Sequence, residues 1–370
     1  MKTLFTVLSA ASFALLSIPA HAQDDADAPR WSIAIHGGAG VILRENMSTE
    51  QQAEYEAALQ AALDAGAEVL RNGGSAMDAV KAAIVPMEDD EKFNAGRGAV
   101  YTWEGHNELD AAIMDGSDRS AGAITGVTTV KNPILLADAV RSDGRHVFLS
   151  GAGAEEFAGD TGLELVDPTY FGTERRKEAL ERMKAKQLSA LDVDHKFGTV
   201  GAVALDSQGN LAAGTSTGGL TGKRWGRIGD APVIGAGTYA DNRSCAVSAT
   251  GAGEYFIRVG VAQEICTRLR YQPVGWSIYA DDAGAAEHPA LPDILSDEEA
   301  VAELYESYLV AAQGTADVVM SEVAELGGDG GVILVTPQGH TIFSFNTPGM
   351  YRGRANSEGL NEVAIFEAAE

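Results

Sequence analysis

The sequence is poor in residues that commonly bind transition metals. Its 370 residues include two cysteines, Cys245 and Cys266, and seven histidines. The cysteines form no CxxC motif and the histidines show no zinc-type spacing, which argues against a zinc site. Two cysteines cannot build a disulfide scaffold, although an oxidising compartment would permit one bridge between them. Because cysteine is often simply a small core residue, we expect two buried free thiols.

Basic residues are also scarce. The chain has 27 Lys and Arg against 53 Asp and Glu, which gives a formal net charge of -26. Such a surface repels nucleic acid phosphates and anionic lipid headgroups, so we expect neither nucleic acid nor a membrane as a partner. A small zwitterionic amino acid or dipeptide remains compatible with this charge. A ligand inside a pocket responds to local groups more than to a distant surface field.

Long apolar runs are missing after the N-terminal segment, so no later segment is expected to span a membrane. In that first segment, an uncharged stretch from residue 4 to residue 18 follows Lys2 and precedes a small-residue site that ends at Ala22. This layout is typical of a secretory signal peptide of residues 1–22. A retained membrane anchor is the alternative, but the apolar run is short for a span. We therefore expect cleavage near Ala22 and an exported protein, either periplasmic or secreted.

Hydrophobic periodicity and capping signals predict strands and helices in mixed order. An apolar strand at residues 31–35 is followed by helices that begin after Ser48 and Ser75, and the second helix should end at Pro86. Residues 187–197 show no clear period, so we interpret them as an exposed linker. The other expected elements are strands at residues 146–150 and 244–249, helices at 174–186 and 254–270, an acidic helix from residue 296, and a closing hairpin of residues 331–336 and 340–345.

Residues 199–217 are predicted to form a hairpin of two strands with a turn at residues 207–210. Both faces of the first strand carry apolar or small side chains, so this strand should be covered on both sides. Strands occur in adjacent pairs between pairs of helices, which disfavours a strict βαβ repeat. We therefore expect an α+β fold in which another layer packs on each face of a sheet.

Ten motifs rich in glycine, threonine and acidic residues follow one another along the chain. They are HGGAG at residues 36–40, FNAG at 93–96, ELDA at 108–111, MDG at 114–116, GTVGAVALD at 198–206, GTSTGG at 214–219, GRIGD at 226–230, GAG at 235–237, TGAGE at 250–254 and FNTPGM at 345–350. Any one of them would be weak evidence. In this order, the set closely resembles the plant-type asparaginase and isoaspartyl peptidase family of N-terminal-nucleophile hydrolases. The resemblance covers essentially the whole chain after residue 22.

This resemblance implies a four-layer αββα sandwich of the N-terminal-nucleophile hydrolase type. It also implies that the chain cuts itself between Gly198 and Thr199, which would separate an α subunit of residues 23–198 from a β subunit of residues 199–370. A threonine hydroxyl is a poor nucleophile without a base, and a residue made N-terminal by cleavage carries its own amine within reach. An α-amine titrates at about 7.7 to 8.0, so a useful fraction is free base near neutral pH. Glycine before the cut fits because it tolerates a strained backbone.

The resemblance also implies roles for residues around Thr199. Thr217 should hydrogen-bond the nucleophile, and Asn94 should support this hydrogen-bond network from the α subunit. The Thr250 hydroxyl and the Gly251 backbone N–H should form an oxyanion hole, where each donor typically contributes about 2.7 to 4 kcal/mol.

A second group of residues should bind the substrate headgroup. Arg227 is planar and bidentate, so it suits the substrate α-carboxylate, and Asp230 suits the α-ammonium group. Gly253 belongs to the same predicted substrate site. Taken alone, Arg227 and Asp230 could be an ordinary surface ion pair. The accompanying motifs favour the functional interpretation, which predicts recognition of a free amino acid headgroup.

The resemblance further implies a structural sodium ion, held by backbone carbonyls of the loop at residues 87–97. No cofactor is expected for the chemistry itself, because the amine of Thr199 supplies the base. The family also implies a homodimer of α/β pairs. The residues expected around the sodium ion are Met87, Glu88, Asp90, Phe93, Ala95 and Arg97.

The predicted activity is the hydrolysis of β-aspartyl (isoaspartyl) dipeptides and L-asparagine, which releases L-aspartate. A glycosylasparaginase-type amidase is one alternative, because it uses a similar threonine and headgroup clamp. A catalytically dead exported protein that binds amino acids is the other. An insertion at residues 274–295 departs from the family pattern, and Trp225 lies in a variable stretch near the proposed mouth of the site. Both features leave the preferred amide open.

Overall fold

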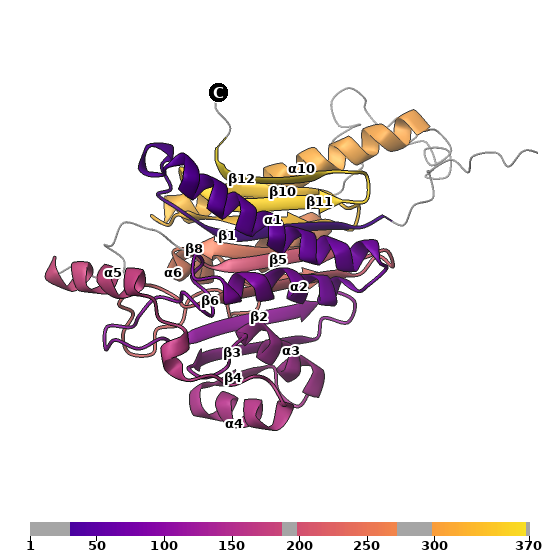
Figure 1. Cartoon of the computed structure of the whole chain (residues 1–370). Helices are drawn as coiled ribbons and strands as arrows, with labels where there is room; N and C mark the ends of the chain where they lie inside the picture. Colours follow the sequence, from indigo (N-terminus) through magenta and orange to yellow (C-terminus); the bar gives the residue numbers. More distant parts are fainter. Residues whose placement is uncertain (1–29, 187–197, 272–297, 368–370) are drawn as a thin grey trace, which may run out of the picture.

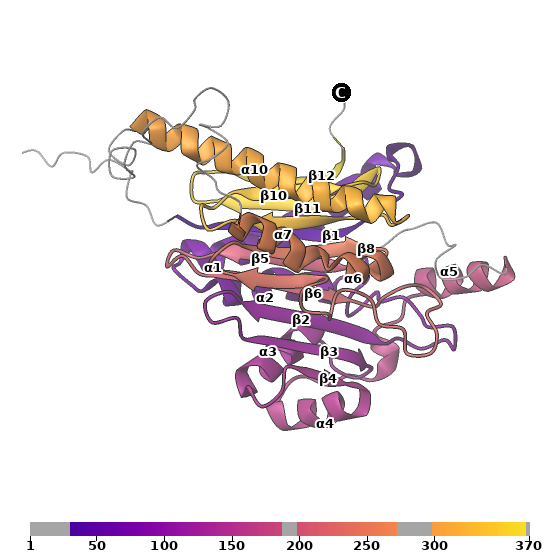
Figure 2. The same cartoon turned by 180° about the vertical axis from the view of Figure 1, so that it is seen from behind.

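The computed structural model describes residues 30–186, 198–271 and 298–367, with the side chains of residues 298–305 left out. The predicted signal peptide, the predicted linker at residues 187–197 and the insertion at residues 274–295 therefore lie outside the described residues. Two sheets lie against each other, and helices cover the outer face of each sheet (Figure 1 and Figure 2).

The larger sheet contains eight strands in the order β12-β11-β1-β5-β6-β2-β3-β4. Its pairings are antiparallel except for the parallel pair β3 and β4. Strands from both ends of the chain therefore meet beside β5. The strands are β1 (Ser32–Gly40), β2 (Leu109–Asp115), β3 (Ala121–Val127), β4 (Phe148–Ser150), β5 (Val200–Leu205), β6 (Leu211–Thr217), β11 (Gly349–Asn356) and β12 (Asn361–Phe366).

The smaller sheet contains four antiparallel strands in the order β10-β9-β8-β7. One face of this sheet packs against the larger sheet, and an apolar core fills the space between them. The strands are β7 (Thr238–Asp241), β8 (Cys245–Gly251), β9 (Gly330–Val335) and β10 (Thr341–Phe345).

Helices form the two outer layers, each with its own apolar core. Helices α1, α2 and α3 pack on the larger sheet, whereas α7 and α10 pack on the smaller one. The expected four-layer αββα sandwich is therefore confirmed. The helices are α1 (Thr49–Arg71), α2 (Ala76–Asp89), α3 (Pro133–Asp143), α4 (Gly151–Thr161), α5 (Glu174–Ala185), α6 (Gly253–Val259), α7 (Val261–Tyr271) and α10 (Glu298–Glu325).

The predicted hairpin around residue 199 is confirmed as β5 and β6. Val200 pairs with Ser216 and Leu205 with Leu211, so a short turn joins the strands. All six residues of β5 are buried, because α2 covers one face and strands of the smaller sheet cover the other. The residue that precedes β5 is therefore held at the edge of a rigid, covered strand.

Two helix predictions need correction. Helix α2 continues through Pro86 to Asp89, because this extension buries Met87 and Glu88. A proline inside a helix removes one hydrogen bond and its ring clashes with the preceding turn. The burial of Met87 and the two hydrogen bonds of the Glu88 side chain offset that cost. The single helix predicted at residues 254–270 is two helices, α6 and α7, separated at Gly260. Its φ of 70° lies in the left-handed region, which ends the first helix.

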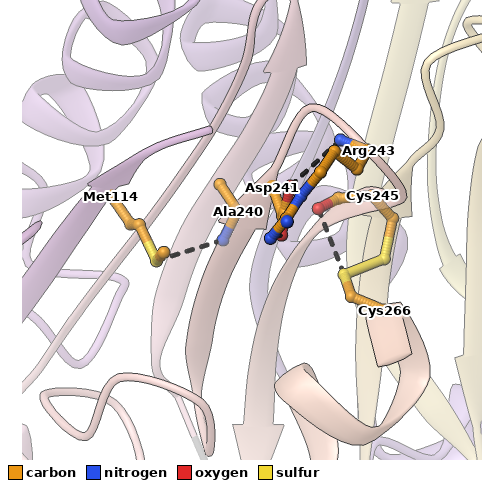
Figure 3. Close-up of a disulfide and its surroundings, with 6 residues drawn as sticks. All are labelled: Met114, Ala240, Asp241, Arg243, Cys245 and Cys266. Atoms are coloured by element: carbon orange, nitrogen blue, oxygen red, sulfur yellow. Dashed lines mark hydrogen bonds and ion pairs between the residues drawn. A yellow bond between two sulfur atoms is a disulfide. The ribbon is translucent and has the colours of Figure 1, made fainter. Parts of the chain in front are cut away.

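Cys245 and Cys266 form a disulfide bond, so the expectation of two free thiols is wrong. Cys245 begins β8 and Cys266 lies on α7, which packs on the same sheet (Figure 3). Their α-carbons are 5.3 Å apart, within the range for a disulfide. The sequence does not reveal this contact, because it depends on how the helix packs on the strand. Nearby, the backbone N–H of Ala240 donates to Met114 Sδ and joins the two sheets (Figure 3).

Candidate active site

Thr199 lies directly before β5 and is buried. Its Oγ1 is 3.1 Å from Oγ1 of Thr217, the last residue of β6. Thr217 Oγ1 also accepts a hydrogen bond of 3.0 Å from the backbone N–H of Gly219. The antiparallel hairpin thus places the two threonine hydroxyls side by side, as the sequence predicts.

Asn94 joins the segment before Thr199 to the turn after β6. Its backbone N–H donates to the Gly198 carbonyl (2.9 Å), and its own carbonyl accepts from the Gly218 N–H (3.0 Å). Its side chain donates to the Gly219 carbonyl (2.8 Å) and accepts from the Val100 N–H (2.9 Å). Every polar group of Asn94 therefore has a partner, and the residue fixes both segments around the threonine pair.

Thr250 and Gly251 end β8, and Thr250 carries a buried hydroxyl without a protein partner among the described residues. A buried hydroxyl without a hydrogen bond costs about 1 to 3 kcal/mol, so a ligand oxygen bound there would be stabilising. Gly251 has a φ of 155°, and a Cβ at this position would lie 2.4 Å from the Asp329 carbonyl oxygen. Only glycine fits there.

Arg227 makes a bidentate ion pair that the sequence did not predict. Its Nε and Nη2 donate to Oε1 and Oε2 of Glu254, each at 2.8 Å. A guanidinium has five N–H donors in two forks, so the end formed by Nη1 and Nη2 still has donors to offer. A Cβ on Gly219 would lie 3.5 Å from Nη1, so that end points toward the Thr217 turn.

Asp230 is 5% exposed, and its Oδ2 has no partner among the described residues. Burial raises the pKa of Asp230 to about 7, and the charge of Arg227 opposes part of that rise. Gly253 lies against both groups. A Cβ there would be 2.7 Å from Asp230 Oδ1 and 3.0 Å from Arg227 Nη2. The three residues predicted to bind the headgroup are therefore brought together.

Sequence reasoning missed two residues of this site, Glu254 and His36. Glu254 lies in the TGAGE motif, in the first turn of α6. His36 begins the HGGAG motif, and its Nδ1 is 3.0 Å from the Thr199 carbonyl oxygen. Both motifs were recognised, but only the folded chain shows which partner each side chain meets. Trp225, which lies near Arg227 in the sequence, is 93% exposed.

The predicted sodium loop folds back on the end of α2. The Arg97 N–H donates to the Glu88 carbonyl (2.7 Å). Gly96 has a φ of 47°, and a Cβ added there would collide with the same Glu88 carbonyl. The Glu88 side chain points elsewhere, because its Oε1 accepts from Ser216 Oγ and the Ile134 N–H. Burial raises the pKa of Glu88 to about 8.

Among the described residues, no group of three or more His, Cys, Asp or Glu could hold a metal ion. A cation in the loop would therefore depend on backbone carbonyl oxygens, which suit hard cations.

Comparison with known proteins gives consistent matches. The family model described as "Asparaginase" matches residues 29–283. The isoaspartyl peptidase of Escherichia coli K12 is 42% identical over 329 residues, which cover 86% of this chain and 91% of that protein. A probable isoaspartyl peptidase/L-asparaginase 2 of Arabidopsis thaliana is 36% identical over 364 residues, which cover 91% and 99%. The human isoaspartyl peptidase/L-asparaginase is 46% identical over 233 residues, which cover 62% and 74%.

These relatives correct the predicted location. Characterised homologues such as the E. coli and mammalian isoaspartyl peptidases are cytosolic, which contradicts the prediction of a periplasmic or secreted protein. That prediction depended on residues 1–22, which lie outside the described part of the chain. Within that part, every helix is too short or too polar to cross a membrane.

Proposed function

This chain belongs to the asparaginase family and is an asparaginase-type amidohydrolase, and we propose that it releases L-aspartate from β-aspartyl dipeptides and L-asparagine after cutting itself before Thr199. The supporting observation is a pair of buried polar atoms without protein partners in the described structure, Thr250 Oγ1 and Asp230 Oδ2. Buried polar groups normally have partners, and Asp230 packs against Gly253, which follows Thr250 closely in the sequence, so this pair indicates where a polar ligand binds.

The proposed reaction begins when the free amine of Thr199 takes the proton of its own hydroxyl. Oγ1 then attacks the side-chain carbonyl carbon of the substrate, and the developing oxyanion accepts hydrogen bonds from the Thr250 hydroxyl and the Gly251 N–H. The tetrahedral intermediate then collapses and its C–N bond breaks, while the protonated amine of Thr199 passes its proton to the leaving group. Water then hydrolyses the resulting ester by the same route and releases aspartate.

The proposed headgroup site determines which substrates fit. The unused donors of Arg227 bind the α-carboxylate in a bidentate manner, and the Asp230 carboxylate binds the α-ammonium. Glu254 keeps the guanidinium oriented through its own two hydrogen bonds. A glycosylasparagine presents the same headgroup, so the names of the relatives, isoaspartyl peptidase and asparaginase, support our choice between them. Parallel assays on the three substrates distinguish the alternatives.

We also propose two features of the assembled enzyme. A sodium ion occupies the loop at residues 87–97, which is supported by the way that loop closes on the Glu88 carbonyl. Two α/β pairs form a dimer, which is supported by the family resemblance and by apolar surface on α10, where Val310 and Val318 are exposed.

Replacing the nucleophile tests the proposed function directly. Thr199→Ala removes the attacking hydroxyl, so we expect an uncut chain without hydrolytic activity. The wild-type protein should give two fragments, one of which starts at Thr199. Denaturing mass spectrometry measures the cut, native mass spectrometry counts the chains, and an aspartate-release assay measures turnover.

Thr336→Ala is the matched control, because Thr336 is another buried threonine and lies directly after β9. This variant should cut itself and remain active. A wild-type chain that is fully active while uncut, or a Thr199→Ala variant with normal turnover, would refute the mechanism.

A further inference from the structure

A chain of buried side-chain hydrogen bonds crosses between the two sheets and ends on the Thr199 main chain. His36 on β1 places Nδ1 3.0 Å from the Thr199 carbonyl oxygen and Nε2 2.9 Å from Ser248 Oγ on β8. Ser248 Oγ lies 2.7 Å from Thr215 Oγ1 on β6, and Thr215 Oγ1 lies 2.7 Å from Thr238 Oγ1 on β7. His36 and the three hydroxyl residues are fully buried.

The directions of the two hydrogen bonds of His36 follow from the first acceptor, the Thr199 carbonyl oxygen. A carbonyl oxygen can only accept, so Nδ1 of His36 must carry a proton and donate it to Thr199. Burial lowers the pKa of His36 to about 3, so the ring is neutral and Nε2 carries no proton. Ser248 must therefore donate to Nε2. The Thr215 hydroxyl has two acceptors within reach, Ser248 Oγ and the Gly237 carbonyl oxygen at 3.0 Å. The Thr238 hydroxyl likewise has Thr215 Oγ1 and the Ala231 carbonyl oxygen at 3.0 Å.

The larger sheet leaves space for the imidazole ring of His36. His36 pairs directly with Gly201 on β5, and a Cβ on Gly201 would lie 2.3 Å from Nε2 and 2.0 Å from Ser248 Oγ. The pairing of β1 with β11 also shifts register between His36 and Gly38, as in a β-bulge. Bulges commonly redirect a side chain next to an active site. The glycine and the bulge together leave room for an imidazole in an otherwise close-packed interior.

We propose that His36 is a positioning residue that orients the nucleophile through the carbonyl of Thr199. This inference rests on the proposed function, in which Thr199 is the nucleophile. Thr199 precedes the first residue of β5, and a side chain, not a strand neighbour, holds its carbonyl. After cleavage, nothing covalent precedes Thr199. The hydrogen bond from His36 then fixes the plane of the peptide group between Thr199 and Val200, and hence the position of the Thr199 Cα from which the amine and Oγ1 project.

His36 does not act as the general base. Its Nδ1 proton is donated to a carbonyl, and its one lone pair, on Nε2, accepts from Ser248. No lone pair is left for the Thr199 hydroxyl. The contribution of His36 to catalysis is therefore geometric, and a misplacement of about 1 Å can cost about 100-fold in rate.

A pair of variants tests this role. His36→Leu removes the donor, and His36→Asn keeps an amide N–H close to the position of Nδ1. We expect His36→Leu to lower kcat by about 10- to 100-fold while KM stays within about twofold, because Arg227 and Asp230 are untouched. His36→Asn should recover most of kcat. Equal activity of the two variants, or a loss that appears mainly in KM, would overturn the proposal.

The ring can also be observed in the wild-type protein, which keeps the proposal testable if His36→Leu does not fold. Nitrogen-15 NMR of the processed protein should show one histidine that carries its proton on Nδ1 and does not titrate between about pH 5 and about pH 9. His36→Asn should remove that resonance. A proton on Nε2, or titration in that range, would overturn the inference. A wild-type protein that hydrolyses none of the substrates would instead refute the proposed function, while the NMR result still decides the state of the ring.

Discussion

Asp230 is a carboxylate whose buried position disfavours its ionised form. It is almost completely buried, and burial raises its pKa from 3.8 in a free side chain to about 7. Holding it ionised at neutral pH therefore costs folding free energy, and the charge of Arg227 and nearby backbone N–H groups offset part of this cost. A bound α-ammonium group would supply the missing partner. The residue is consequently expected to favour binding at the expense of stability.

Asp230→Asn should stabilise the folded protein at high pH and abolish substrate binding. The cost of ionising Asp230 is absent below its unfolded pKa, grows as pH rises from about 4 to about 7, and is at most about 4 kcal/mol. Urea unfolding should therefore favour the variant more at about pH 8 than at about pH 5. The exposed Asp143→Asn variant is the control and should show no such gain. A variant less stable than wild type at pH 8 would contradict this account.

The sequence predicted the side chains of the site better than their contacts. Thr217, Asn94, Asp230 and Gly253 were predicted because each lies in a recognisable motif. The fold places Thr217 beside Thr199, Asn94 on the turn after β6, and Gly253 against Asp230. The Glu254 partner of Arg227 could not be predicted, because the charge pattern allows several acidic partners. Only the packing of α6 beside the preceding loop selects one of them.

The proposed sodium ion in the loop at residues 87–97 predicts that the stability of the protein depends on sodium. Exchanging sodium for choline at constant ionic strength should lower the thermal unfolding midpoint, because choline is too large for a backbone site. An ion at 100 times its Kd stabilises a protein by about 2.7 kcal/mol, which corresponds to a shift of several degrees. Differential scanning fluorimetry measures the midpoint in both salts.

Two glycine variants separate this effect from a general salt effect. A Cβ at Gly96 would collide with the Glu88 carbonyl, so Gly96→Ala should remove the dependence on sodium. Gly105 also has a positive φ but no atom near its Cβ position, so Gly105→Ala should keep the dependence. If the wild-type midpoint is the same in both salts, the loop does not hold sodium.

Elements were predictable where apolar side chains are large and regularly spaced. Helix α1, with its Ser48 capping box, and the β9–β10 hairpin are examples. The strands β2, β3 and β11 were not predicted, because they are rich in alanine and glycine, which have little strand preference. These strands are stabilised by neighbours that are distant in the sequence, and a local pattern does not contain that information.

The disulfide joins the smaller sheet to its outer helix layer, and it stabilises the molecule as a whole. It closes a loop with a sequence separation of 21 residues, for which loop-closure entropy predicts about 3 kcal/mol. We expect the Cys245→Ala/Cys266→Ala double variant to unfold at a lower urea concentration. Activity at moderate temperature should persist, because Thr250 lies about 16 Å further along β8.

Reductant provides the control for this prediction. Dithiothreitol should lower the stability of the wild-type protein toward that of the double variant and leave the double variant unchanged. A wild-type protein that unfolds at the same urea concentration with and without reductant would show that the bond does not contribute.

At the scale of the whole molecule, the four layers could be predicted from the sequence, but the order of the strands within the larger sheet could not. The resemblance implied two sheets between helix layers, and the covered faces of β5 agreed with it. The position of β1 between β5 and β11 requires pairing between segments that are far apart in the chain. Many such pairings satisfy the same hydrophobic pattern, so the sequence alone does not choose between them.

That strand order determines what a break before residue 199 would do. Along the larger sheet, β12 and β11 come from the second fragment, β1 from the first, β5 and β6 from the second, and β2, β3 and β4 from the first. The two polypeptides would therefore be interleaved at three strand boundaries. Neither could leave without dismantling the sheet, so the severed protein would persist as one particle. Once unfolded, its pieces would have to find each other again by a bimolecular encounter that the intact precursor never needs.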